Sequence, residues 1–257
     1  NIKGCFIWKR SKKMIKFNHV SKFYGEKEVL SDLAMSINDG EIFGLIGHNG
    51  AGKTTTLSIL TSIIEATYGD VYIDDLLLSE HHDAIKKNIG YVPDSPDIFL
   101  NLTALEYWNF LAKIYDVEKE ITQSRIDQLS RLFDLFEHKN DTIDSFSHGM
   151  RQKVMVIGAL ISNPDIWILD EPLTGLDPQA AFDLKEMMKE HAKSGKTVVF
   201  STHVLAVAEQ LCDRIGILKQ GKMIFLGTLN ELKANHPGQD LESIYLELAG
   251  RRLKEEG

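Results

Sequence analysis

One glycine-rich segment restricts the folds that this chain can adopt more than any other feature of its sequence. The segment fits the pattern GxxxxGK[ST] and consists of Gly47-His48-Asn49-Gly50-Ala51-Gly52-Lys53-Thr54-Thr55. Residues 41–46 before it, which are mostly apolar, predict a strand, and residues 53–64 after it have helical spacing. Glycines let backbone N–H groups in such a turn point inward, and the helix N-terminus adds the positive end of its dipole. The segment therefore predicts a phosphate-binding loop between a strand and a helix.

Several residues of this loop have expected roles. Lys53 supplies a point charge for phosphate oxygens, and the Thr54 hydroxyl is a ligand for Mg²⁺. Phosphate contacts are expected from Gly47, Asn49, Gly50, Gly52, Lys53, Thr54 and Thr55. A plain glycine turn is the alternative, and the strand before it and the helix after it disfavour that interpretation.

Two adjacent carboxylates, Asp170 and Glu171, follow the apolar run 166–169, which is typical of a buried parallel strand. Open α/β sheets bind their ligands at the carboxyl ends of such strands. We expect Asp170 to hold Mg²⁺ and Glu171 to polarise an attacking water. A solvated loop with two acids is the alternative, which the upstream phosphate loop disfavours.

The rest of the chain predicts an α/β core interrupted by helices. Strands are expected at 15–20, 29–37, 71–73, 89–92 and 197–200, and residues 100–140 have helical periodicity only. Thr103 and Glu106 form a capping-box pair at the start of this helical region.

Composition excludes several classes of protein. The 257 residues carry a net charge of −8, so the chain lacks the overall positive charge that is typical of nucleic-acid-binding domains. No apolar stretch approaches the ~18–20 residues that a membrane span needs. Cys5 and Cys212 offer no disulfide framework, which indicates a reducing compartment.

The residues Phe146-Ser147-His148-Gly149-Met150-Arg151-Gln152, shortly before the acidic pair, resemble the signature usually written LSGGQ. With the two motifs above, they make the chain resemble ATP-binding subunits of ABC transporters, closest to bacterial ABC-2-type exporter subunits. The resemblance implies an α/β P-loop NTPase (RecA-like) core with an N-terminal antiparallel β subdomain and an inserted α-helical subdomain. It places the ATPase domain at 14–248, with a core at 14–93 and 160–228, a helical lobe at about 95–159 and a helical tail at 229–257.

The resemblance also implies roles for single residues. Ser147 and Gly149 would cap the γ-phosphate of an ATP held by a second subunit, and Tyr24 would stack on adenine. Asp177 would contact the dimer partner, and His203 would contact the γ-phosphate. Simpler interpretations exist: Ser147 and Asp177 are good helix N-caps, and Tyr24 suits the end of a strand.

The chain departs from the family pattern at three positions. Asp94 stands where the family usually has Gln; its carboxylate can bind Mg²⁺ or water, but it adds negative charge near the phosphates. His148 and Met150 replace the usual Gly and Gln of the signature. The other histidines, including His81, His82 and His138, show no metal-ligand spacing and are expected on the surface.

The resemblance implies a dimer that uses ATP and Mg²⁺ and docks onto separate membrane permease subunits at the cytoplasmic face of the membrane. Their coupling helices would lie near residues 94–102. The second half of the dimer is either another copy of this chain or a paralogue, and a homodimer is the simpler expectation because the composite site is complete in one chain. The acidic charge balance argues against a nucleic-acid partner. The segment 241–248 resembles the tail of ABC-2-type subunits, which favours export. The main alternative is a soluble ABC ATPase with a regulatory role; a small-molecule P-loop kinase is disfavoured, because the signature has no part in that chemistry.

The first 13 residues are basic, with Lys3, Lys9, Arg10, Lys12 and Lys13 and no acid. We expect residues 1–13 to be an upstream or added leader; a basic-aromatic contact with a membrane surface is the alternative.

Overall fold

The computed structural model describes residues 14–248. The predicted leader, residues 1–13, lies outside them, as do residues 249–257 of the predicted tail. Within the described range, no helix has the length and apolarity that crossing a membrane requires.

An antiparallel sheet begins the fold, as the family resemblance implies. Its strand order is β2-β1-β4-β5, with β1 at Met14–Tyr24, β2 at Lys27–Asn38, β4 at Tyr68–Ile73 and β5 at Leu76–Leu77. β1 and β2 are longer than predicted because their pairing continues past Val20 to Tyr24 and Lys27 through register shifts. Such bulges let a ladder continue where the alternation of apolar and polar residues breaks down.

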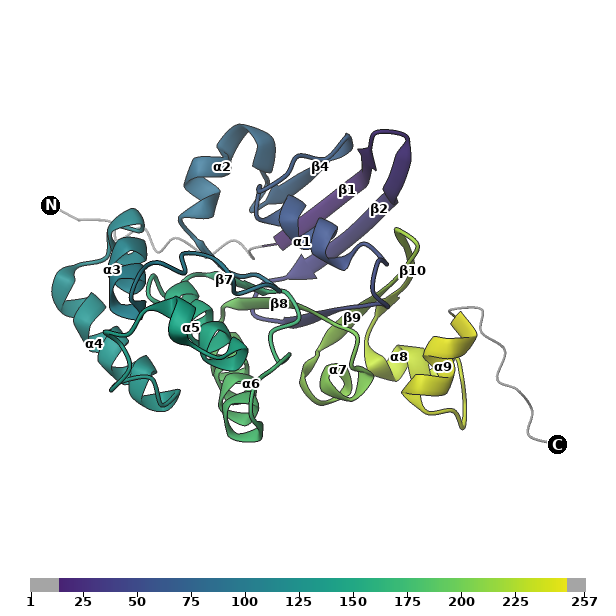
Figure 1. The fold of residues 1–257 in the computed structure, drawn as a ribbon. Coiled ribbons are helices and arrows are strands. Elements are labelled where there is room, and N and C mark those ends of the chain that lie inside the picture. The colour runs from purple at the N-terminus through teal and green to yellow at the C-terminus, as the bar shows by residue number, and fades with distance from the viewer. Residues whose placement is uncertain (1–13, 249–257) are drawn as a thin grey trace, which may run out of the picture.

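A second sheet forms the centre of the molecule, with strand order β10-β9-β3-β8-β7-β6 (Figure 1). Its strands are β3 Ile42–Ile46, β6 Ile89–Val92, β7 Ile166–Leu169, β8 Thr197–Thr202, β9 Arg214–Lys219 and β10 Lys222–Gly227. All pairs are parallel except β9 with β10. Every residue of β3, β7 and β8 is buried, as expected for strands covered on both faces.

Both faces of the second sheet are covered. On one face, the antiparallel sheet packs with α1 (Lys53–Leu60) and α2 (Leu78–Lys86) in one apolar cluster. On the other face, α5 (His148–Leu160) and α6 (Pro178–Lys193) pack in a second cluster. α1 ends four residues before the predicted Ile64, because Ser62 has a φ of 53° and leaves the helical conformation.

The inserted helices lie together at one end of the molecule (Figure 1). They are α3 at Ala104–Ile114, α4 at Lys119–Leu132 and a short 3₁₀ turn at Ile143–Ser145. The predicted capping box of Thr103 and Glu106 is confirmed at the start of α3. Trp108 is fully buried and donates its indole N–H to the Val154 carbonyl of α5 at 3.0 Å, which anchors the inserted helices to the core.

The C-terminal helices close the other end of the molecule (Figure 1). They are α7 at Leu205–Leu211, α8 at Leu229–Ala234 and α9 at Leu241–Leu248. Leu232, Leu241 and Ile244 pack against β9 residues in a third apolar cluster. The residue limits given above for core, lobe and tail stay predictions.

Candidate functional site

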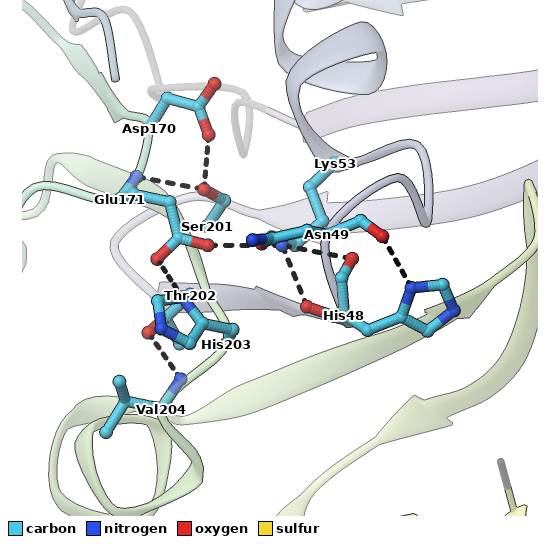
Figure 2. A network of polar contacts seen from close by, with 10 residues as sticks. His48, Asn49, Lys53, Asp170, Glu171, Ser201, Thr202, His203 and Val204 are labelled. Carbon is cyan, nitrogen blue, oxygen red and sulfur yellow. Dashed lines mark hydrogen bonds and ion pairs between the residues drawn. The ribbon is translucent and has the colours of Figure 1, made fainter. Parts of the chain in front are cut away.

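Three chain segments meet at the carboxyl edge of the parallel sheet. β3 lies beside β8, and β8 beside β7, with Ile46 paired to Thr202 and Leu169 to Phe200. Because all three strands run in the same direction, the residues that follow them emerge side by side. These are the phosphate loop, His203 and the acidic pair, which Figure 2 shows close together.

Lys53 is the cation at the centre of the site. Its side chain is only 6% exposed, and its ammonium donates to the Gly47 carbonyl at 2.8 Å and lies 3.1 Å from Glu171 Oε1. A buried ammonium needs such partners because desolvation is costly. Gly52 precedes it with a φ of 109°, and a Cβ there would lie 2.7 Å from the Leu30 side chain. The loop therefore requires glycine at this position.

Glu171 joins the cation to the histidine. Its Oε2 accepts a hydrogen bond from His203 Nδ1 at 2.9 Å, so one carboxylate contacts both Lys53 and His203 (Figure 2). Glu171 has a φ of 47°, a conformation that a non-glycine residue adopts only when its surroundings hold it. Its backbone N–H donates to Ser201 Oγ at 3.0 Å, which supplies that constraint.

Ser201 was not among the sequence-predicted site residues. It is fully buried at the end of β8, accepts from the Glu171 N–H and donates its hydroxyl to Asp170 Oδ1. The only sequence signal was a hydroxyl directly after the apolar run 198–200, two residues before His203. Ser201 thus fixes both members of the acidic pair from the neighbouring strand.

The residues around Asp170 fit a Mg²⁺ ion. Burial raises the pKa of Asp170, against hydrogen bonds from the Ser201 and Thr54 hydroxyls that lower it. Its second oxygen, Oδ2, is buried and has no hydrogen-bond partner among the described residues. Such an oxygen is costly to leave bare and suits a cation ligand. Within residues 14–248, no group of three His, Cys, Asp or Glu side chains could hold a metal, but Mg²⁺ typically needs only one or two carboxylates together with substrate phosphates.

A cavity of about 660 Å³ opens above these groups. The predicted residues that line it are Asn49, Gly50, Gly52, Lys53, Thr54, Thr55, Asp94, Glu171 and His203. Lys27, Glu28, Val29, Thr174 and Gln220 also line it and were not predicted. Gln220 reaches the site because the turn between β9 and β10 packs on the loop, where the Gly221 N–H donates to the Ala51 carbonyl at 2.9 Å.

Six predicted residues do not line this cavity. Two of them, Gly47 and Asp170, are buried beside residues that do line it: the Gly47 carbonyl accepts from Lys53, and Asp170 lies next to Glu171. Ser147 is exposed and caps α5, accepting from the Met150 N–H at 3.3 Å. Asp177 caps α6. The helix-cap interpretations of both residues are therefore confirmed. Tyr24 is 51% exposed at the end of β1.

Gly149, the last of the six, packs against a neighbouring loop. A Cβ on Gly149 would lie 2.5 Å from the Gly175 carbonyl oxygen, so only glycine allows this close approach. The start of α5 and the loop before α6 are also joined by the ion pair of Lys153 and Asp177 at 2.9 Å.

The prediction for the remaining histidines holds for His81, His82 and His138, which are exposed. It is wrong for His191, whose Nε2 is buried and whose ring stacks edge-on against Trp167 at 5.5 Å. Burial lowers the pKa of His191 from 6.5 to about 4. This ring is therefore neutral at physiological pH.

A glycine-rich loop with its lysine, followed by an acidic pair at the carboxyl edge of a parallel sheet, defines a P-loop nucleoside triphosphatase. The pattern of the family described as "ABC transporter" matches residues 30–174. The chain belongs to this family, and it is an ATP-binding subunit that hydrolyses ATP. The resemblance and the fold class predicted from the sequence are both confirmed.

Two curated relatives from Bacillus subtilis illustrate the similarity. The linearmycin resistance ATP-binding protein LnrL is 34% identical over 219 residues, covering 85% of this chain and 70% of its own length. The ABC-type transporter ATP-binding protein EcsA is 35% identical over 227 residues, covering 88% and 92%.

Solved structures show the same fold. An ATP-binding subunit of an ABC transporter superposes with a TM-score of 0.86 at 33% identity, covering 91% of this chain and 99% of the other. A dimeric ATP-binding cassette in a post-hydrolysis state, bound to ADP and Pi, superposes with a TM-score of 0.76 at 30% identity, covering 84% and 98%.

Proposed function

We propose that Glu171 is the catalytic carboxylate and that Lys53, the loop N–H groups and His203 hold the phosphates. The observation that carries this is the convergence of Lys53, Glu171 and His203 on one cavity. Phosphate oxygens compete with Glu171 for the Lys53 ammonium, which frees the carboxylate to accept a proton from water. The water oxygen then bonds to the γ-phosphorus as the bond to ADP breaks, and His203 donates to the γ-phosphate.

Thr54, Asp170 and Asp94 would hold Mg²⁺. When bound, the ion supplies positive charge that offsets the charge developing on the phosphate oxygens. The bare Asp170 Oδ2 and the Thr54 hydroxyl beside it support this assignment. The Ser201 hydroxyl, which donates to Asp170 Oδ1, holds the Asp170 carboxylate in the orientation that this role needs.

The active form is a head-to-tail homodimer. Ser147 and Gly149 lie at the start of α5, where the helix N-terminus favours an anion, yet neither lines the cavity of its own chain. In the dimer, they cap the γ-phosphate held by the partner, and Asp177 contacts the partner. Tyr24 provides an exposed ring for adenine. The dimeric relative bound to ADP and Pi supports a dimer for this chain.

An integral membrane permease docks beside the inserted helices. Ile98, Phe99 and Phe110 are all more than a third exposed, and the rings of Phe99 and Phe110 lie 5.8 Å apart. Exposed apolar clusters of this kind mark interaction sites. The cluster follows Asp94 in sequence, and Asp94 lines the nucleotide cavity. Docking there places the protein at the cytoplasmic face of the membrane.

The direction of transport is export. The name of LnrL assigns that relative to resistance against linearmycin, and removal of a toxic compound from the cell is one means of resistance. The resemblance of residues 241–248 to the tail of ABC-2-type subunits points the same way.

Two experiments test the proposal. Glu171→Gln with Mg-ATP should run as a dimer in size-exclusion chromatography with light scattering, and as a monomer without nucleotide. A monomer under both conditions would contradict the dimer. The chain purified from membranes in mild detergent should bring down a polytopic membrane protein; recovery from the cytosol alone would contradict the docking.

A further inference from the structure

Arg151, in the first turn of α5, joins three segments. Its Nε donates to the Ile143 carbonyl at 3.2 Å, Nη2 to the Asp144 carbonyl at 2.7 Å, and Nη1 to Asp97 Oδ1 at 2.6 Å. Its side chain is 20% exposed, whereas that of Asp97 is 50% exposed. A guanidinium can serve three acceptors at once because its donors form a rigid planar fork, which a lysine lacks.

The two carbonyl partners lie directly before the signature. Ile143 and Asp144 belong to the 3₁₀ turn that leads into Ser147. By bonding these carbonyls from the first turn of α5, Arg151 fixes the direction in which the chain approaches the helix. The orientation of the Ser147 hydroxyl and of the α5 N-terminus depends on that direction.

The third partner belongs to a different part of the fold. Asp97 lies between Asp94, which lines the nucleotide cavity, and the exposed Ile98 and Phe99. The backbone continues the connection, since the Asp144 N–H donates to the Leu100 carbonyl at 3.0 Å. The loop after Asp94 and the 3₁₀ turn before α5 are therefore joined by two contacts. The contact at the half-exposed Asp97 is the closer of the two to solvent.

We infer that Arg151 is a positioning residue that holds the Ser147 end of α5 in register with the loop 94–99. This inference rests on the proposed homodimer, in which Ser147 serves the ATP of the partner. Arg151 does not line the nucleotide cavity of its own chain. Its loss should therefore weaken the ATP-driven dimer without weakening the binding of nucleotide to the monomer. Asp97 is adjacent to Ile98 and Phe99, so a partner bound to these two residues would also act on the ion pair with Arg151. Through that ion pair, the partner would alter the position of the Ser147 end of α5 relative to the loop 94–99.

The test compares Arg151→Ala, Arg151→Lys and Asp97→Ala, each in the Glu171→Gln background. Sedimentation velocity with Mg-ATP gives the dimer dissociation constant, and fluorescent ATP titrated at low protein concentration gives the affinity of the monomer. Arg131→Ala is the matched control, because Arg131 contacts only the Phe136 ring among the described interactions.

We expect Arg151→Ala to weaken the dimer at least tenfold while monomer affinity changes less than twofold. Asp97→Ala should give a smaller loss, since both carbonyl bonds remain, and Arg151→Lys should fall between the parent and Arg151→Ala. If Arg151→Ala dimerises like the control, or loses monomer affinity to the same extent, the inference is overturned. If the parent itself does not dimerise with ATP, the proposed function fails instead.

Discussion

Ser201→Ala tests whether the catalytic pair depends on a single hydroxyl of β8. The change removes the donor to the Asp170 carboxylate and the acceptor of the Glu171 N–H. A hydrogen bond to a charged group is worth about 1.5–3 kcal/mol, and an unsatisfied buried N–H costs about 1–3 kcal/mol. Because the two groups are neighbours, the losses overlap, and we expect the free energy of unfolding to fall by about 2–4 kcal/mol.

For a chain of this size, that loss lowers Tm by about 4–16 °C. Glu171 also loses the constraint on its left-handed backbone, so kcat should fall about tenfold or more, with KM for ATP changed less than about threefold. Differential scanning calorimetry and phosphate release measure the two effects. Ser130→Ala is the matched control, since Ser130 is fully buried but donates only to the Asp127 carbonyl at 3.4 Å. Equal Tm and kcat in the two variants would refute the reasoning.

Three further predictions concern separate parts of the structure. Lys53→Ala removes the buried ammonium and should weaken ATP binding at least tenfold in a fluorescent-nucleotide titration; an unchanged affinity would show that Lys53 does not hold phosphate. Because burial lowers the pKa of His191 to about 4, the unfolded chain gains this proton first, and the free energy of unfolding should fall by about 2 kcal/mol as pH drops from 6.5 to 4. His191→Gln should flatten that slope in urea unfolding, and the same slope in both proteins would disprove the cause. Gly149→Ala places a Cβ 2.5 Å from the Gly175 carbonyl oxygen and should lower the free energy of unfolding by about 1–3 kcal/mol. A rise of about 1 kcal/mol in that free energy, as expected of alanine in an open helix, would show that the Gly175 loop moves aside without cost.

The phosphate loop and the acidic pair could be predicted because their signals are local. Gly52, Lys53 and Thr54 lie within three consecutive positions between a strand and a helix, and Asp170 and Glu171 follow one buried run. Parallel strands then place both motifs at the same edge, whatever the details of packing.

The residues that the sequence did not predict act across the fold. Ser201 matters because β8 lies beside β7, and Gln220 because the turn from β9 to β10 packs on the loop. His191 has the position of an ordinary basic residue in the last turn of α6, and its burial depends on tertiary neighbours such as the Trp167 ring of β7. Such consequences depend on tertiary neighbours that no local pattern encodes.

The proposed hydrolysis depends on Glu171 as the carboxylate that activates water. The most direct measurement is phosphate release from Mg-ATP by the purified chain, compared between the parent, Glu171→Gln and Glu209→Gln. Glu209 is an exposed residue of α7 that pairs with Lys233 of α8 and does not line the nucleotide cavity, so it serves as the matched change. We predict a rate at least about a hundredfold lower for Glu171→Gln alone, with ATP affinity retained. A Glu171→Gln protein that releases phosphate at the parental rate would contradict the account.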